Sequence, residues 1–284
     1  MSVKAGLRFM VLLERAALLL RGLGLGRVVD VVRDRTLVRL GPFEASIGTA
    51  RLSGATQPHL QYFRELREGR EGYMAELFAE AAARPLALVV DGGAHLGYLT
   101  QLAAASGARV VAFEPNPETR GLLERGLERT GLAARVTVIP RALAERTEER
   151  RLFLSGGGDT SSLFDHAGSS GAVTVSCVRG DEILASEHRV DVVKLDIEGG
   201  EVGALAGMRG TLARSGDGVI VFAECNPEAL HAAGTSPKAL VEALRAHALD
   251  VFVCDEQSRR LVPWHEAAVD GIGYVNLYAA RGRE

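Results

Sequence analysis

A strand that runs directly into an acid and a glycine-rich turn constrains the fold of this chain more than any other feature. Residues 89–100 read VVDGGAHLGYLT, and a second apolar segment ends in FEPNP at residues 113–117. A buried strand, a glycine turn, a helix and a second strand ending in a carboxylate form the unit by which open α/β sheets hold an adenosine-type cofactor. We therefore expect an α/β fold with a nucleoside-binding turn near its centre.

The residue types in this unit suit a ligand. Gly93 and Gly97 allow the positive φ angles of a sharp turn, and they leave no side chain in a ligand's way. Glu114 is expected where the second strand ends, and a carboxylate there can accept hydrogen bonds from both hydroxyls of a ribose. A strand, turn and helix without any ligand is the simpler alternative.

The order of the acid and the glycines favours one class of cofactor. Dinucleotide folds usually carry G-x-G-x-x-G, whereas this chain has D-G-G-x-x-x-G, with His95 near the place of the missing glycine. Asp91, directly before the turn, would repel a pyrophosphate but suit the ammonium and sulfonium groups of S-adenosylmethionine. We expect S-adenosylmethionine as cofactor. The alternatives are an NAD-dependent oxidoreductase that uses Glu114 on its ribose, and a non-catalytic binding protein with the same fold.

Composition limits the partners. The chain has 284 residues, of which 24% are charged, and a net charge of −3, so we expect no nucleic-acid partner. Three widely spaced cysteines argue against a disulfide framework or a zinc site, and the reducing cytoplasm is the expected location.

Residues 1–84 are expected to form an N-terminal α/β extension, for acceptor recognition or oligomer contact. Its first apolar segment, residues 10–20, is interrupted by Glu14 and Arg15, which predicts an amphipathic helix without stable membrane insertion. This helix would pack on its own domain or on a second copy of the chain, and reversible contact with a membrane surface is the alternative. Short strands within 27–47 and a helix over 61–83 complete the extension.

From Pro85 onward, strands and helices alternate. Apolar runs predict strands at 86–91, 109–114, 136–140, 190–196, 219–224, 251–254 and 272–280. Such alternation implies a parallel sheet with right-handed crossovers, and the last two strands suit an antiparallel ending. We expect residues 85–284 to form a Rossmann-like, mostly parallel seven-stranded sheet with an antiparallel last strand, the class I methyltransferase layout. Two more strands, 151–154 and 173–178, flank a glycine- and serine-rich loop at 156–171, a candidate active-site lid.

Carboxylates gather where strands are expected to end. Asp196 ends one strand, Glu198 and Glu201 follow it, and Glu224 ends the next strand. Because ligands of open α/β sheets bind beyond the carboxyl ends of the strands, we assign catalytic roles to Asp196, Glu198 and Glu224. A carboxylate whose pKa is raised by a partly apolar pocket could take the proton of an acceptor hydroxyl.

Other roles for these and nearby residues remain open. Glu201 could serve only to cap a helix, and Lys194 could be a paired cation. Asp196, Glu224 and Asn226 could hold a Mg²⁺ ion, but we do not favour a metal. His95 could be the base, although a histidine in a glycine turn more often shapes the loop or touches the cofactor.

With these motifs assembled, the chain from about residue 72 to 281 resembles the FkbM family of S-adenosylmethionine-dependent methyltransferases. Residues 90–100 match V-D-x-G-A-N-x-G-x-x-T except that His95 replaces asparagine. Residues 113–117 match F-E-P-x-P in full, and residues 194–201 match K-x-D-x-E-G-x-E, with Gly200 where histidine is common.

The resemblance implies cytoplasmic O-methylation of a hydroxyl on a natural product or a saccharide, with S-adenosylhomocysteine as by-product. The residues that we assign to the cofactor are Asp91, Gly93, His95, Gly97, Glu114, Pro115 and Asp196. The acceptor would be recognised by the N-terminal segment and the 156–171 loop, which lie outside the cofactor motifs.

Overall fold

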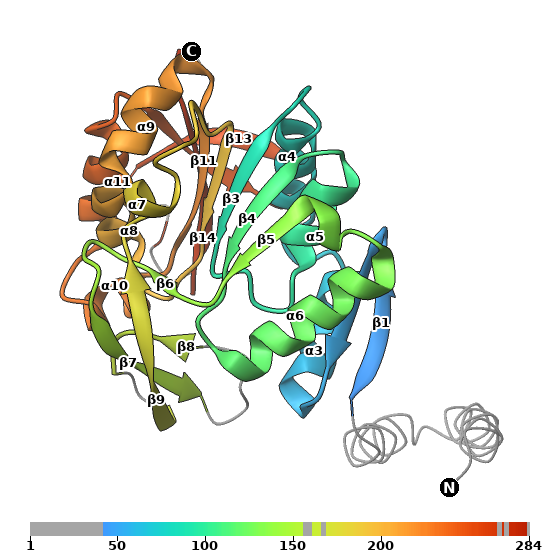
Figure 1. The fold of residues 1–284 in the computed structure, drawn as a ribbon. Coiled ribbons are helices and arrows are strands. Elements are labelled where there is room, and N and C mark those ends of the chain that lie inside the picture. Colours follow the sequence, from blue (N-terminus) through green and yellow to red (C-terminus); the bar gives the residue numbers. More distant parts are fainter. Residues whose placement is uncertain (1–41, 156–160, 166–168, 266–268, 270–272, 283–284) are drawn as a thin grey trace, which may run out of the picture.

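The computed structural model describes residues 42–155, 161–165, 169–265, 269 and 273–282. A central sheet carries helices on both faces, and smaller β-structures lie beside it (Figure 1). The amphipathic helix expected at 10–20, and the part of the expected 27–47 strands before residue 42, lie outside the described residues.

The central sheet has eight strands. In spatial order they are β13 (Arg260–Pro263), β12 (Asp250–Asp255), β14 (Val275–Ala280), β11 (Ile220–Cys225), β10 (Val192–Leu195), β3 (Leu88–Gly92), β4 (Arg109–Phe113) and β5 (Val136–Ile139). The five strands from β11 to β5 are parallel, and β14 runs antiparallel between β11 and β12. The seven expected strands are therefore present in a mostly parallel sheet with an antiparallel last strand, and β13 adds one more at the edge.

Alternate residues of the strands build two separate cores, as expected for a sheet covered on both faces. Val90 and Val193 point to one face and Val89 and Val192 to the other. The first face is covered by α7 (Gly180–Ile183), α8 (Glu201–Gly207), α9 (Arg209–Ser215), α10 (Pro227–Ala232) and α11 (Pro237–Arg245). The second face is covered by α4 (Gly72–Ala82), α5 (Tyr98–Ala105) and α6 (Pro117–Thr130). Short 3₁₀ turns follow at η1 (Ala133–Arg135) and η2 (Gly216–Gly218).

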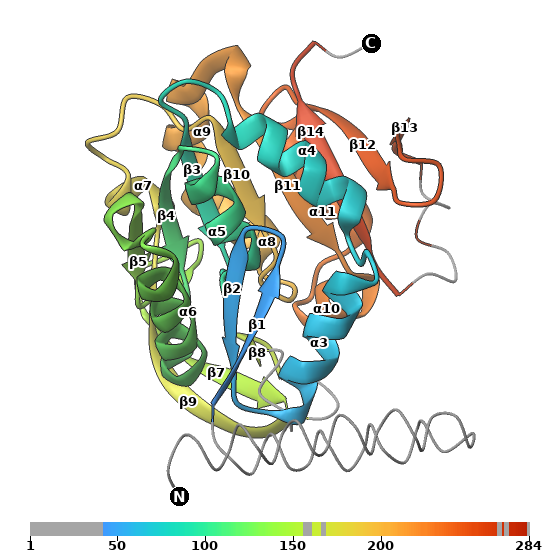
Figure 2. The same ribbon diagram turned by 90° about the vertical axis from the view of Figure 1, so that its right-hand side faces the viewer.

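The helix expected over 61–83 is two helices. The structure has α3 (Gln57–Arg67) and α4, separated by a turn in which Gly69 and Glu71 both take positive φ angles. The expectation of one helix was wrong. Glu68 and Arg70 are compatible with a helix, so the sequence pattern did not indicate that the helix ends at Gly69. This break turns α3 away from α4 toward the hairpin of β1 (Phe43–Ile47) and β2 (Ala50–Gly54), whose apolar residues share a small core with it (Figure 2).

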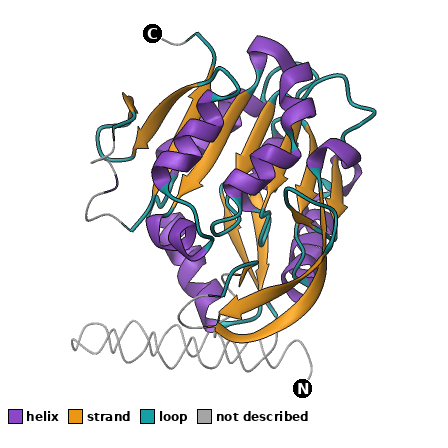
Figure 3. Cartoon of the chain, turned by 90° about the vertical axis from the view of Figure 1, so that its left-hand side faces the viewer, coloured by secondary structure: helices purple, strands orange, loops and turns teal. Residues whose placement is uncertain are grey.

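A second, four-stranded sheet interrupts the alternation of strands and helices after β5. It contains β6 (Ala142–Leu143), β9 (Ser169–Val178), β7 (Glu149–Ser155) and β8 (Ser161–Ser162), in that spatial order. Figure 3 shows a long curved strand below the central sheet, separate from it. The described part of the expected 156–171 loop includes β8, which pairs with β7. None of the helices in the described part of the chain is both long and apolar enough to cross a membrane.

Candidate active site

A cavity of about 290 Å³ opens where the parallel strands of the central sheet end. The sequence-predicted residues that line it are Asp91, Gly93, His95, Glu114, Pro115, Asp196, Glu198 and Glu224. Gly97 is not among the lining residues, because it packs against the side chain of Leu123. The fold therefore brings residues from three distant motifs to one space.

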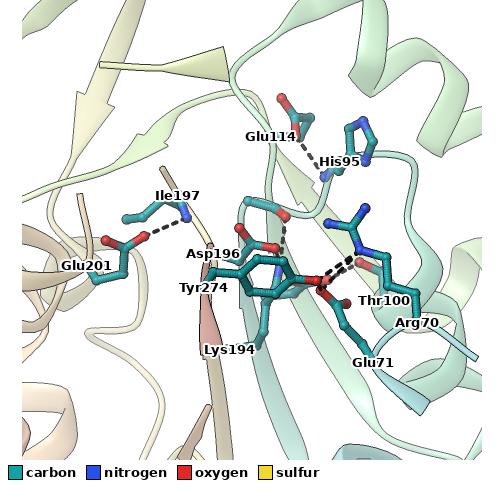
Figure 4. Close-up of polar contacts among 12 residues, drawn as sticks. Arg70, Glu71, His95, Thr100, Glu114, Lys194, Asp196, Ile197, Glu201 and Tyr274 are labelled. Atoms are coloured by element: carbon teal, nitrogen blue, oxygen red, sulfur yellow. Dashed lines mark hydrogen bonds and ion pairs between the residues drawn. The ribbon is translucent and has the colours of Figure 1, made fainter. Parts of the chain in front are cut away.

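Lys194 ties two of these motifs together. Its strand β10 pairs with β3 so that Lys194 lies directly opposite Asp91. The Lys194 Nζ atom lies 3.5 Å from Asp91 Oδ1 and 3.3 Å from Asp196 Oδ2, and it donates a hydrogen bond of 2.9 Å to the carbonyl oxygen of Gly93 (Figure 4). Burial alone would lower the pKa of Lys194, but the carboxylates of Asp196 and Asp91 raise it, which keeps the ammonium charged.

Asp91 is almost fully buried and has two kinds of partner. Its Oδ2 atom accepts a hydrogen bond of 2.5 Å from the Thr100 hydroxyl, in the first turn of α5. Its Oδ1 atom faces Lys194 and has no hydrogen bond to any other part of the described chain. Much of the negative charge of Asp91 is therefore already balanced by Lys194, so attraction of a cationic ligand depends less on Asp91 than the sequence argument supposed.

Glu114 presents its carboxylate to the cavity in a defined orientation. Its Oε2 accepts from the backbone N–H of His95 and its Oε1 from that of Asn116, each at 2.8 Å. A carboxylate has about four acceptor positions, so about two remain for hydroxyl groups of a ligand. Burial raises the pKa of Glu114 to about 7, against the opposing effect of the two backbone hydrogen bonds.

The glycine turn approaches the end of β10 too closely for a side chain. At Gly93, with φ of +76°, a Cβ atom would collide with the carbonyl oxygen of Asp196. His95, two residues later, also has positive φ, +51°, a conformation in which asparagine, aspartate and histidine are enriched among non-glycine residues. Its ring lies 5.2 Å from that of Tyr62 in an edge-to-face contact. Histidine in place of asparagine thus keeps the turn conformation and adds packing against α3.

The loop after Asp196 is held rigidly. Glu198 has a φ of +52°, which is uncommon for a residue other than glycine, and its carbonyl oxygen accepts a 2.7 Å hydrogen bond from the Ser162 hydroxyl. The buried carboxylate of Glu201 accepts from the backbone N–H groups of Ile197, at 2.9 Å, and Gly199, at 3.3 Å (Figure 4). Glu201 therefore shapes the loop that precedes α8, and burial raises its pKa to about 7.

Asp196, Glu198 and Glu224 form an acidic cluster, with carboxylate oxygens that all lie within 4.8 Å of one another. Burial, followed by the neighbouring charges of Asp196 and Glu201, raises the pKa of Glu198 to about 8. Burial and the charges of Asp196 and Glu198 raise the pKa of Glu224 well above its ordinary value. Asn226 is not part of the cluster, because its side chain caps the N-terminus of α10 by accepting from Glu228 and Ala229.

Several cavity residues were not identified from the sequence. Tyr62, Arg70 and Glu71 line the cavity from α3 and the turn before α4. Tyr274, which precedes β14, is not among the lining residues but contacts two of them, Arg70 and Glu71. The hydroxyl of Tyr274 accepts from Arg70 Nε at 3.0 Å and donates to Glu71 at 3.2 Å (Figure 4). Ordinary polar and aromatic residues in a helical stretch carry no signal of this kind. Only the break between α3 and α4 turns Tyr62, Arg70 and Glu71 toward the cavity.

Comparison with known families gives one match, which covers four of the parallel strands of the central sheet, β4, β5, β10 and β11. The family described as Methyltransferase FkbM domain matches residues 91–248, which is more than half of the chain. The matched range includes residues 113–117 and 194–201 and the glycine turn from Asp91 onward. Comparison with curated proteins gave no match.

Three of the solved structures to which this chain is similar are described as methyltransferases. A methyltransferase FkbM from Methylobacillus flagellatus KT is 16% identical, with a TM-score of 0.45, and the alignment covers 89% of this chain and 60% of that chain. A SAM-dependent O-methyltransferase from Thermotoga maritima is 16% identical, with a TM-score of 0.40 and coverage of 74% and 66%. A precorrin-6y C5,15-methyltransferase from Geobacter metallireducens GS-15 is 13% identical, with a TM-score of 0.43 and coverage of 74% and 87%.

Proposed function

The chain belongs to the FkbM methyltransferase family and is an S-adenosylmethionine-dependent methyltransferase; from this premise we propose that it methylates a hydroxyl group on a natural product or a saccharide. One observation carries the proposal. A single cavity holds a carboxylate suited to a ribose, Glu114, together with the acidic cluster of Asp196, Glu198 and Glu224. Such a cavity has room for a nucleoside at one place and acceptors for a proton at another.

The residues present fit the cofactor. Glu114 keeps about two free acceptor positions for ribose hydroxyls, and the glycine turn leaves open backbone beside them. Asp196, which shares Lys194 with Asp91 but is about one-third exposed, is the carboxylate of the β10 end most open to a cationic group. When bound, S-adenosylmethionine supplies a methyl group on a sulfonium; transfer breaks the carbon–sulfur bond, leaves its electron pair on sulfur, and forms a bond from carbon to the acceptor oxygen.

The protein's own contribution is alignment and removal of a proton. Methyl transfer from a sulfonium needs an in-line approach of the acceptor, which a shaped cavity supplies. The acceptor hydroxyl loses its proton as the new bond forms, and the acidic cluster is placed to assist that loss. Backbone hydrogen bonds to Ser162 and Glu201 hold the loop that carries Glu198, so the cluster is positioned before any ligand arrives.

The far wall of the cavity suits a polar acceptor. Tyr62, Arg70 and Glu71 line this wall and combine an aromatic ring with charged groups. Tyr274, behind them, links Arg70 and Glu71 through its hydroxyl group. A surface of this kind can stack against a ring and bind hydroxyl groups, as a saccharide or a polyhydroxylated natural product requires. We propose that residues between 57 and 84 select the acceptor. In this proposal residues 1–84 form an extension that is separate from the methyltransferase domain of residues 85–284.

Two measurements test the function. Calorimetry with S-adenosylhomocysteine and with NADH should show binding of the first and not of the second. Extracts of cells that have and lack the gene should then differ by a compound that carries one methyl group fewer in the deletion, and the purified protein should restore that group. Absence of S-adenosylhomocysteine binding would contradict the proposal, and a restored methyl on nitrogen or carbon would contradict its hydroxyl specificity.

A further inference from the structure

We propose that Asp196, Glu198 and Glu224 bind a hard divalent cation, Mg²⁺ or Mn²⁺, in the cavity. The site is defined by residues alone, and only its role in catalysis rests on the proposed function. The sequence suggested Asn226 as a ligand, but its side chain caps α10, and Glu198 takes its place in the cluster.

The geometry of the cluster fits such an ion. Each of the three residues offers one carboxylate oxygen, and all three oxygens lie within 4.8 Å of one another. Oxygens on opposite sides of a hard cation are separated by roughly 4 to 5 Å, twice the usual metal–oxygen distance. Carboxylates with waters or a substrate oxygen completing the shell are the usual environment of Mg²⁺.

A second observation is independent of the cluster's shape. Glu224 is only 8% exposed and lines the cavity, yet its carboxylate takes part in no hydrogen bond and no ion pair within the described residues. A buried carboxylate without a partner is costly to ionise, and native proteins pair such ionised groups or use them to coordinate metals. An unpartnered carboxylate that faces two others is therefore best explained by a cation among them.

The neighbouring positive charges do not balance the cluster. Lys194 contacts Asp196, but it is shared with Asp91. Arg70 is engaged with Glu65, Glu71 and Tyr274. Glu71 and Glu201, which also face this region, add negative charge. A divalent cation would remove most of this imbalance.

The supporting contacts resemble those of a prepared metal site. Ser162 donates to the carbonyl oxygen of Glu198, and Glu201 holds the backbone of Ile197 and Gly199. Outer contacts of this kind orient the ligands of metal sites. If the proposed function is correct, the acceptor hydroxyl would coordinate the cation, which lowers the pKa of the hydroxyl and so eases its loss of a proton to solvent.

The test is Mn²⁺ binding by the full chain without cofactor, followed by electron paramagnetic resonance of free Mn²⁺, with Mg²⁺ as competitor. The wild type should bind one Mn²⁺, and Glu224→Gln and Glu198→Gln should each weaken binding by more than about 10-fold. Glu114→Gln removes a buried charge from the same cavity but outside the cluster, and it should bind Mn²⁺ within about 2-fold of the wild type.

Thermal unfolding keeps the test informative if a variant is destabilised. Mn²⁺ should raise the unfolding midpoint of the wild type but not that of Glu224→Gln, which should already unfold at a higher temperature without metal because repulsion is relieved. No Mn²⁺ binding by the wild type, equal binding by Glu224→Gln, or release of Mn²⁺ by S-adenosylhomocysteine would overturn the proposal. The last outcome would identify the cluster as the site of the cofactor's ammonium group.

The cation site and the proposed function can fail separately. Methyl transfer that persists in a chelator, together with no Mn²⁺ binding, would remove the cation and leave the function. Mn²⁺ binding with the expected variant effects, but no methyl transfer to any hydroxyl, would remove the function and leave the cation site.

Discussion

The ammonium group of Lys194 donates a hydrogen bond to the carbonyl oxygen of Gly93, across 101 residues of sequence. The same group lies within ion-pair distance of Asp91 and Asp196. One side chain therefore joins the glycine turn, the acid before it and the acid at the end of β10. The shape of the cofactor site therefore depends on Lys194, although the partners of Lys194 are residues of the protein and not the cofactor.

Lys194→Met should strongly destabilise the fold. Removal of one partner from a buried ion pair typically costs about 3–5 kcal/mol, because the remaining charges lose their compensation. We expect a loss of about 3 kcal/mol in the free energy of unfolding by urea at pH 8. Arg125→Met, at an exposed position of the helix α6, serves as control and should change stability by less than about 0.5 kcal/mol. A Lys194→Met protein as stable as the wild type would contradict the assignment.

Gly93→Ala tests the close approach of the turn to β10. Alanine in this left-handed conformation costs about 1–2 kcal/mol, and its Cβ would also collide with the Asp196 carbonyl. Gly131→Ala is the matched control, since Gly131 has a φ of +69° but nothing near its Cβ position. Calorimetry with S-adenosylhomocysteine should show normal affinity for Gly131→Ala and at least about 10-fold weaker binding for Gly93→Ala. Equal affinities of Gly93→Ala and Gly131→Ala for S-adenosylhomocysteine would mean that neighbouring atoms move to accommodate the new Cβ atom.

Cofactor affinity should depend on pH through Glu114. The pKa of this carboxyl is raised to about 7, mainly by burial, so the group gains a proton as pH falls below 7. A neutral carboxyl accepts fewer hydrogen bonds from ribose hydroxyls, and S-adenosylhomocysteine should bind more weakly at pH 6 than at pH 8. In Glu114→Gln the affinity should be lower at pH 8 and change less between the two values. A profile as steep as that of the wild type would assign the pH dependence to another group.

The raised pKa of Glu114 also makes the free energy of unfolding depend on pH. A carboxyl whose pKa is raised on folding binds protons more readily when folded, so its ionisation destabilises the native state. The free protein should lose stability as pH rises from about 4.5 to 7, and Glu114→Gln should show a smaller loss over that range. Urea unfolding at several pH values, without cofactor, measures this loss in the free energy of unfolding. A loss that is unchanged by the substitution would show that Glu114 ionises without cost.

Asp196→Ala should separate chemistry from cofactor binding. Because Asp196 is one of three carboxylates in the acidic cluster, we expect its removal to reduce turnover by at least about 100-fold. Glu114 and the glycine turn are unchanged, so binding of S-adenosylhomocysteine should remain measurable by calorimetry. Turnover equal to that of the wild type would remove Asp196 from the mechanism.

Residue order alone was enough for seven strands of the central sheet and for the glycine turn. Buried apolar runs predicted β3, β4, β10 and β11, because strands covered on both faces need continuous apolar sequence. Positive φ at Gly93 and Gly97 followed from the need for a sharp turn, and both angles are observed. These features are local, so their signals lie within a few residues of one another.

Only the tertiary structure decided how the site is assembled. The pairing register of β3 and β10 sets Lys194 beside Asp91, and the break after α3 turns Tyr62 and Arg70 toward the cavity. The tertiary structure also assigns the Asn226 side chain to a helix cap. It places Glu224 beside Asp196 and Glu198, with no hydrogen-bond or ion-pair partner among the residues that the structure describes. Local sequence determined the strands and the turn, because short-range sterics and burial govern them. Which charges meet, and which remain unbalanced, depends on contacts between segments far apart in the chain, and these exist only once the sheet has formed.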